Sequence, residues 1–199
     1  MIKILGIGAS PRKGGNTDIL LKYLSKGASS QNVSTEEIHL RDYSFQSCLG
    51  CEACRKAKEC TGLNDDMQLL YPKIQEAKGL ILVSPVHNYN MSALMKAFID
   101  RLYCFYDFSE ERPGNWSSRL AGQGRKAIIA AIGEQSNSEE GGMDLTLKAM
   151  RLPVEALGYE IISIIPILGI FDKGKIESNK KILNKAENLG RQMAKSVEE

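Results

Sequence analysis

Four of the five cysteines lie between positions 48 and 60, in the pattern C-x2-C-x2-C-x5-C. They are Cys48, Cys51, Cys54 and Cys60. Three thiolates at intervals of three residues can surround one compact centre from a tight loop, and such a run is typical of the ligands to a 4Fe–4S cluster. Structural zinc usually takes two separated C-x2-C pairs. A cluster, zinc and unmetallated thiols are therefore the alternatives. A ferredoxin domain is disfavoured, because no proline follows Cys60.

A second segment with chemical potential is the glycine-rich run G-A-S-P-R-K-G-G-N-T, from Gly8 to Thr17. It follows an apolar run and precedes a helical pattern, so a phosphate there would meet free backbone N–H groups and the positive end of a helix dipole. The segment also supplies polar side chains, namely Ser10, Arg12, Asn16 and Thr17. It matches neither the dinucleotide nor the P-loop fingerprint. We predict phosphate binding, and the alternative is a turn with a polar helix cap.

Two further polar loops follow predicted strands. Residues 84–90 read S-P-V-H-N-Y-N, whose side chains and backbone amides suit a flat, hydrogen-bonding ring. His87 also fits an ordinary loop histidine, and Tyr89 either stacks on a ring or caps the sheet. Residues 132–142 carry glycines that allow close approach to a ligand. An ordinary mobile loop explains residues 132–142 equally well.

Apolar runs alternate with helical patterns along the whole chain. The predicted strands cover residues 2–9, 33–40, 79–84, 127–132 and 160–168, and the predicted helices cover 17–26, 65–76, 92–106, 142–158 and 175–197. Residues 107–124 read as a long polar loop. We predict a single α/β domain over residues 1–199, with a flavodoxin-like, doubly wound parallel sheet of strand order 2-1-3-4-5. The apolar third strand suits the centre, and Pro166 restricts the fifth strand to an edge. The cysteine-rich loop follows strand 2.

Composition narrows the functional class. The formal net charge is +2 and no basic stripe with interleaved aromatic residues is present, which argues against nucleic acid as a partner. No apolar span or signal peptide is visible, so we expect a cytoplasmic protein without a membrane partner. Thiols stay reduced in that compartment and can bind metal.

The glycine-rich run, the motif S-P-V-x4-M-S-A-x2-K-A-F-I-D-R and the four-cysteine segment together resemble the iron–sulfur flavoproteins. These belong to the NADPH-dependent FMN reductase and multimeric flavodoxin group, and the resemblance runs from Met1 to about Gly142. It implies an FMN phosphate held by Ser10, Arg12, Asn16 and Thr17. The isoalloxazine and ribityl side would be lined by Pro85, Val86, His87, Asn88 and Asn90, with Gly133 and Glu134 flanking the ring. Cys48, Cys51, Cys54 and Cys60 would ligate a 4Fe–4S cluster, and the protein would be a homo-oligomer, dimer or tetramer.

The expected function is that of an FMN-dependent electron-transfer flavoprotein. Its cluster would pass single electrons from a ferredoxin-type donor to FMN, and a small acceptor would take them from the flavin. No catalytic side chain is predicted, because the cofactors carry the chemistry. One alternative is an NAD(P)H-dependent FMN or quinone reductase without a cluster. Another, from a different class, is a zinc-bound interaction module without enzymatic activity.

Overall fold

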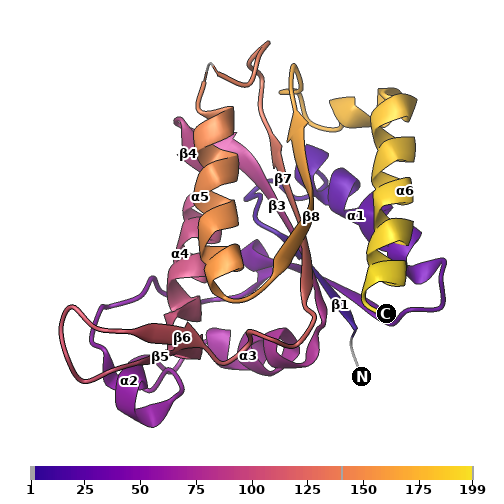
Figure 1. The fold of residues 1–199 in the computed structure, drawn as a ribbon. Helices are drawn as coiled ribbons and strands as arrows, with labels where there is room; N and C mark the ends of the chain where they lie inside the picture. Colours follow the sequence, from indigo (N-terminus) through magenta and orange to yellow (C-terminus); the bar gives the residue numbers. More distant parts are fainter. Residues whose placement is uncertain (1–2, 140, 199) are drawn as a thin grey trace.

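A parallel sheet of five strands forms the centre of the chain, of which the computed structural model describes residues 3–139 and 141–198 (Figure 1). The strands are β1 (Ile4–Gly8), β2 (Thr35–His39), β3 (Gly79–His87), β7 (Lys126–Ile132) and β8 (Glu160–Ile167). Their order is β2-β1-β3-β7-β8, which confirms the predicted doubly wound arrangement. Ile2 of the first predicted strand and Glu140 of the predicted 132–142 loop lie outside the described residues.

The positions of β3 and β8 follow from their residues. The first seven residues of β3 are buried, as expected of a strand with neighbours on both sides and helices on both faces. Among the described strands β8 pairs with β7 alone, so Pro166, which has no N–H to donate, lies in an edge strand as predicted.

Helices cover both faces of the sheet (Figure 1). One face carries α1 (Asn16–Ser29) and α6 (Lys180–Ser196), and the other carries α3 (Met67–Glu76), α4 (Ala93–Arg101) and α5 (Met143–Ala156). Each face has its own buried apolar cluster, and the two clusters are separated by the sheet. In the described part of the chain no helix combines the length and apolarity needed to cross a bilayer.

The predicted long loop at residues 107–124 was wrong in part, because it contains a small hairpin. Strand β5 (Tyr106–Phe108) pairs antiparallel with β6 (Trp116–Ser118). The strands have only three residues each, so local periodicity does not reveal them. They are held by contacts across the hairpin instead, where the ring of Trp116 meets that of Tyr106 edge-on at 5.3 Å between centroids.

Three other predicted boundaries shift. α4 ends at Arg101 and a 3-10 turn continues over Leu102–Phe105, so the predicted 92–106 helix is shorter. β3 runs to His87 and returns as β4 (Asn90–Met91), so that only Asn88 and Tyr89 of the predicted 84–90 loop lie outside strands. The last predicted helix is divided at Asn179, whose side chain accepts the Ile182 N–H at 3.2 Å and caps α6. The cysteine loop contains a short helix, α2 (Ala53–Ala57), that the sequence did not predict.

Candidate functional site

Four loops that follow β1, β3, β7 and β8 surround a cavity of about 1080 Å³ at the carboxyl edge of the sheet. Ten of the eleven residues predicted to bind FMN line this cavity: Ser10, Arg12, Asn16, Thr17, Pro85, Val86, His87, Asn88, Gly133 and Glu134. Asn90 is not among the lining residues, and its side-chain oxygen accepts the Met91 N–H at 2.8 Å. Loops from segments far apart in the sequence are brought together here because parallel strands end at one edge.

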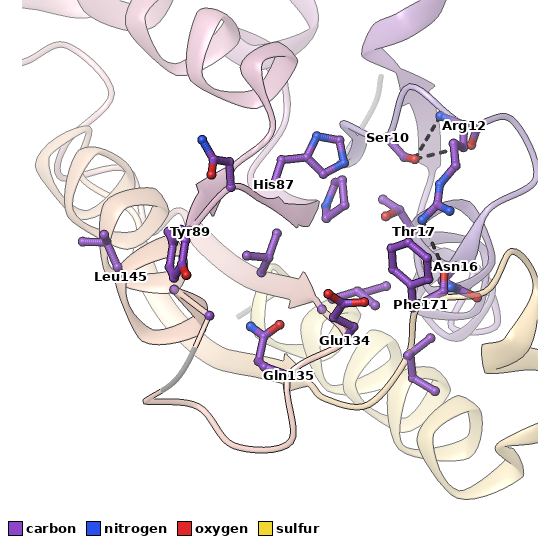
Figure 2. Close-up of a pocket in the computed structure, with 18 of the residues that line it drawn as sticks. Ser10, Arg12, Asn16, Thr17, His87, Tyr89, Glu134, Gln135, Leu145 and Phe171 are labelled. Carbon is purple, nitrogen blue, oxygen red and sulfur yellow. Dashed lines mark hydrogen bonds between the residues drawn. The ribbon is translucent and has the colours of Figure 1, made fainter.

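The phosphate loop, residues 8–17, is organised by hydrogen bonds of its own. The backbone N–H of Arg12 donates to the hydroxyl of Ser10 at 3.1 Å (Figure 2). The N–H of Gly14, which has a positive φ of 68°, donates to the Asp18 carboxylate at 2.7 Å. α1 begins at Asn16, so the N-terminal end of its dipole lies beside the cavity. This is the arrangement that favours an anionic group.

A charged pair behind the loop was not foreseen from the sequence. Arg41 donates to the backbone carbonyl of Ser10 at 3.1 Å and to the Asp18 carboxylate at 2.9 Å. Asp18 in turn accepts the Gly14 N–H. Arg41 and Asp18 therefore connect both halves of the phosphate loop and restrict its backbone from behind.

The segment 168–174, which follows β8, forms a further wall of the cavity that was not predicted from the sequence. Arg12 donates to the carbonyl of Phe171 at 3.4 Å, and its guanidinium lies 5.5 Å from the centroid of the Phe171 ring. Asn16 donates to the Asp172 carbonyl at 2.9 Å and accepts the Ile176 N–H at 3.1 Å. The nitrogen and the oxygen of the Asn16 side-chain amide thus hold this segment and the turn that follows it. The sequence feature that could have indicated this wall is the position of the segment directly after a predicted parallel strand, because the carboxyl ends of such strands border the ligand crevice.

The opposite wall comes from the β3–β4 turn and the loops before α5 (Figure 2). Asn88 and Tyr89 both have positive φ angles, and Tyr89 is 66% exposed. Gly142 lies so close that a Cβ atom there would be 2.1 Å from the Tyr89 carbonyl oxygen. Burial, and then the positive charge of Arg12, lower the pKa of His87. The charge of Arg12 thus acts on His87 from the opposite wall of the cavity.

A second cavity, of about 350 Å³, contains the cysteine segment. It is lined by Cys48, Cys51, Cys54 and Cys60, together with Cys104 and the C-terminal end of α4. All five cysteines are free thiols. Among the described residues no three His, Cys, Asp or Glu side chains gather closely enough to hold a single metal ion. The four predicted ligands therefore share one cavity without forming a tight single-ion site.

Two local features of the cavity are relevant to a thiolate-bound centre. Burial raises the pKa of the Cys54 thiol, and negative charge on Cys60, Cys48 and Cys51 raises it further, so a cationic centre among them would relieve the repulsion. The Gly50 N–H donates to the Cys48 sulfur at 3.4 Å. At Gly62 a Cβ atom would be 2.5 Å from the Cys51 sulfur, so the absence of a side chain leaves room for that sulfur.

The cysteine segment is fixed to the β5–β6 hairpin, seen at the lower left of Figure 1. Arg55 of α2 donates to the Ser109 carbonyl at 2.7 Å, and its guanidinium lies 4.7 Å from the Phe108 ring centroid. At the other end of α4, the Ser92 hydroxyl donates to the Ala9 carbonyl of the phosphate loop at 2.7 Å. Helix α4, about 13 Å long, therefore runs from the phosphate loop to the cysteine cavity.

Comparison with known proteins places this architecture in a family. The model of the NADPH-dependent FMN reductase family matches residues 2–150. An iron–sulfur flavoprotein of Archaeoglobus fulgidus is 30% identical over 199 residues, which cover 99% of this chain and 81% of the relative. An iron–sulfur flavoprotein of Methanocaldococcus jannaschii is 36% identical over 100 residues, which span only about half of each chain (50% and 51%).

Solved structures give the same result for the fold. The NAD(P)H:quinone oxidoreductase from Methanothermobacter marburgensis superposes with a TM-score of 0.74 at 18% identity, and the match covers 96% of both chains. The resemblance to iron–sulfur flavoproteins predicted from the sequence is thereby confirmed. The chain is an FMN-binding flavoprotein and a flavin-dependent oxidoreductase, and it belongs to the NADPH-dependent FMN reductase family.

Proposed function

We propose that the protein transfers electrons between a 4Fe–4S cluster in the cysteine cavity and FMN in the larger cavity, and then to a small acceptor. The observation that carries this proposal is the gathering of Cys48, Cys51, Cys54 and Cys60 in one cavity of a flavin-binding chain. The cluster would supply one-electron transfer, and FMN would accept electrons singly and release them in pairs. The donor would be a ferredoxin-type protein, and the acceptor a quinone, oxygen, peroxide or another small oxidant.

The residues around the larger cavity have distinct tasks in this proposal. Ser10, Arg12 and Thr17 would bind the phosphate, with the N-terminus of α1 adding its dipole. Asn16 would act indirectly, because its amide groups hold the segment that carries Phe171. Pro85, Val86, His87 and Asn88 would line the ring side, while Gly133 and Glu134 would flank it. No side chain is assigned acid or base chemistry.

The metal and flavin contents of anaerobically purified protein test the proposal. Iron and acid-labile sulfide together with FMN are the expected result. FMN alone would instead support an NAD(P)H-dependent FMN or quinone reductase without a cluster. That second function is favoured by the family, whose model matches residues 2–150. Zinc without flavin would mean an interaction module and would contradict both.

Substitutions in the phosphate loop are expected to weaken FMN binding without unfolding the chain. Arg12→Ala removes a charged donor that is exposed in the cavity, and we expect a loss of about 1.5–3 kcal/mol in FMN affinity. Thr17→Ala removes one hydroxyl, which costs about 0.5–1.5 kcal/mol. Fluorescence titration of flavin-free protein measures both. Lys13→Ala, an exposed residue of the same loop that does not line the cavity, is the matched control. Unchanged affinity in both variants would place the phosphate elsewhere.

We also propose that the protein is a homo-oligomer and that the β5–β6 hairpin contributes to the interface. Trp116 on this hairpin is 54% exposed, and tryptophan is enriched at interfaces. Light scattering coupled to gel filtration should give the mass of a dimer or tetramer, and Trp116→Ser should reduce that mass. A monomer at working concentrations would contradict the proposal.

A further inference from the structure

Arg101, the last residue of α4, is a buried arginine beside the cysteine cavity. Only 1% of its surface is exposed. A buried guanidinium is costly unless its charge is paired and its N–H groups have acceptors. The acceptors around Arg101 therefore determine whether the fold tolerates its charge.

Each of the five N–H groups of Arg101 has an acceptor. Nη1 donates to Asp65 Oδ2 at 2.7 Å and to the Gln46 carbonyl at 2.9 Å. Nε donates to the Tyr71 hydroxyl at 3.2 Å. Nη2 donates to Asp65 Oδ1 at 3.0 Å and to the Cys60 sulfur at 3.5 Å. Four of these bonds go to oxygen atoms, and the fifth goes to a predicted cluster ligand.

The bidentate pair with Asp65 already compensates the buried charge. Asp65 also accepts the N–H groups of Gln46 and Met67, at 3.0 and 3.1 Å, so it is fixed by the backbone. This anchored carboxylate sets the orientation of the Arg101 plane. Because the guanidinium group is planar and rigid, the remaining Nη2 hydrogen is consequently directed at Cys60. Lysine has no such fixed set of donors.

Cys60 is held from a second direction as well. The side-chain amide of Gln68 in α3 donates to the Cys60 carbonyl at 2.9 Å. Cys60 is separated by five residues from Cys54, the nearest of the other three cysteines, so its sulfur depends on these contacts for its position. Hydrogen bonds to the ligand sulfurs stabilise the more negative, reduced form of an iron–sulfur cluster and so raise its reduction potential.

We propose that Arg101 is a positioning residue that donates a charge-assisted hydrogen bond to the Cys60 sulfur and thereby raises the reduction potential of the bound cluster. This inference rests on the cluster of the proposed function. It goes beyond that function because one side chain outside the cysteine segment is assigned two tasks. Arg101 would set the reduction potential of the cluster and would hold the Cys60 sulfur in position. In the reduction step the donor loses one electron and the cluster gains it.

The test is a redox titration, followed by electron paramagnetic resonance, of anaerobic wild-type protein and two variants. Arg101→Lys keeps a positive charge beside Asp65 but loses the fork that reaches the sulfur. Arg119→Lys is the matched control, because Arg119 donates to the Lys58 and Cys104 carbonyls, at 2.6 and 2.7 Å, in the same region. We expect Arg101→Lys to shift the reduction equilibrium about tenfold towards the oxidised form, a fall of ~59 mV. Arg119→Lys should leave the potential unchanged, and both variants should keep FMN.

The outcomes separate this inference from the function on which it rests. Wild-type protein without iron and sulfide would overturn the cluster, and the role of Arg101 with it. A wild-type cluster whose potential is the same in Arg101→Lys would overturn the role of Arg101 alone. If Arg101→Lys does not fold, pulsed resonance of the reduced wild-type cluster decides the question, in protein whose arginines carry ¹⁵N only at the guanidinium nitrogens. A ¹⁵N coupling is expected, and its absence would overturn the inference.

Discussion

Changing Cys51 or Cys54 to alanine is expected to remove iron and acid-labile sulfide together, while FMN stays bound at the parental level. A 4Fe–4S cluster is held by four thiolates, so loss of one inner ligand should prevent its stable assembly. FMN should remain because its cavity is built from the loops after β1, β3, β7 and β8, whereas the cysteines line a separate cavity. Iron, sulfide and flavin per chain are measured on protein purified without oxygen.

Reduction of the bound flavin by two different reductants distinguishes the loss of electron entry through the cluster from damage to the flavin itself. With the cluster absent, reduction by a one-electron donor such as ferredoxin should fail, whereas dithionite should still reduce the bound FMN. Under the cluster-free alternative, donor-driven turnover in the variants would match that of the parent. Under the zinc alternative the variants would lose zinc and have no redox phenotype.

Cys104→Ala is the matched control within the same cavity. Cys104 is 4% exposed, burial raises the pKa of its thiol to about 12, and the thiol donates to the Arg101 carbonyl at 3.5 Å. These features are those of a buried, inert thiol. Iron and flavin should both be unchanged in this variant. Iron that survives Cys51→Ala, or that disappears in Cys104→Ala, would show that the ligand set is wrong.

Adding one methyl group at Gly190 should strongly destabilise the protein, although alanine is the better helix former. At an exposed helical position the change from glycine to alanine is worth up to about 1 kcal/mol in favour of the helix. In α6, however, a Cβ atom at Gly190 would lie 1.9 Å from the Leu24 carbonyl oxygen of α1. The reciprocal contact is equally close, since a Cβ at Gly27 would be 1.9 Å from the Glu187 carbonyl oxygen. Both obstacles are helix backbone, so the helices must separate.

We expect Gly190→Ala to lower the free energy of unfolding by about 3 kcal/mol, the upper part of the usual range for overpacking. Urea denaturation followed by circular dichroism measures the change. Gln192→Ala is the control, because Gln192 is exposed on the same helix and should change stability by less than about 0.5 kcal/mol. A Gly190→Ala variant as stable as the parent would show that α1 and α6 are not packed this closely. FMN affinity should fall along with stability, since the phosphate loop leads directly into α1.

The sequence by itself determined the parts of the protein that are encoded locally. Five apolar runs alternating with helical patterns predicted the sheet, and Pro166 predicted which strand lies at the edge, because a missing N–H excludes a central position. The glycine-rich run predicted one wall of the larger cavity, since a strand, a polar turn and a helix are neighbours along the chain. The cysteine spacing predicted that four thiols would lie close together, and they line one cavity, in which Cys60 is also held by contacts from α3 and α4.

Only the tertiary structure decided which distant groups meet. Nothing near Phe171 in the sequence indicates Arg12 as its neighbour, and the contact exists because β1 and β8 end at the same edge of the sheet. Asn16 was predicted to bind phosphate, yet the fold directs its amide to backbone groups 156 and 160 residues away. Arg101 follows helical periodicity, but its five acceptors come from other elements. Periodicity reports which face of an element is buried, whereas pairing of buried polar groups depends on the packing of elements that are remote in sequence.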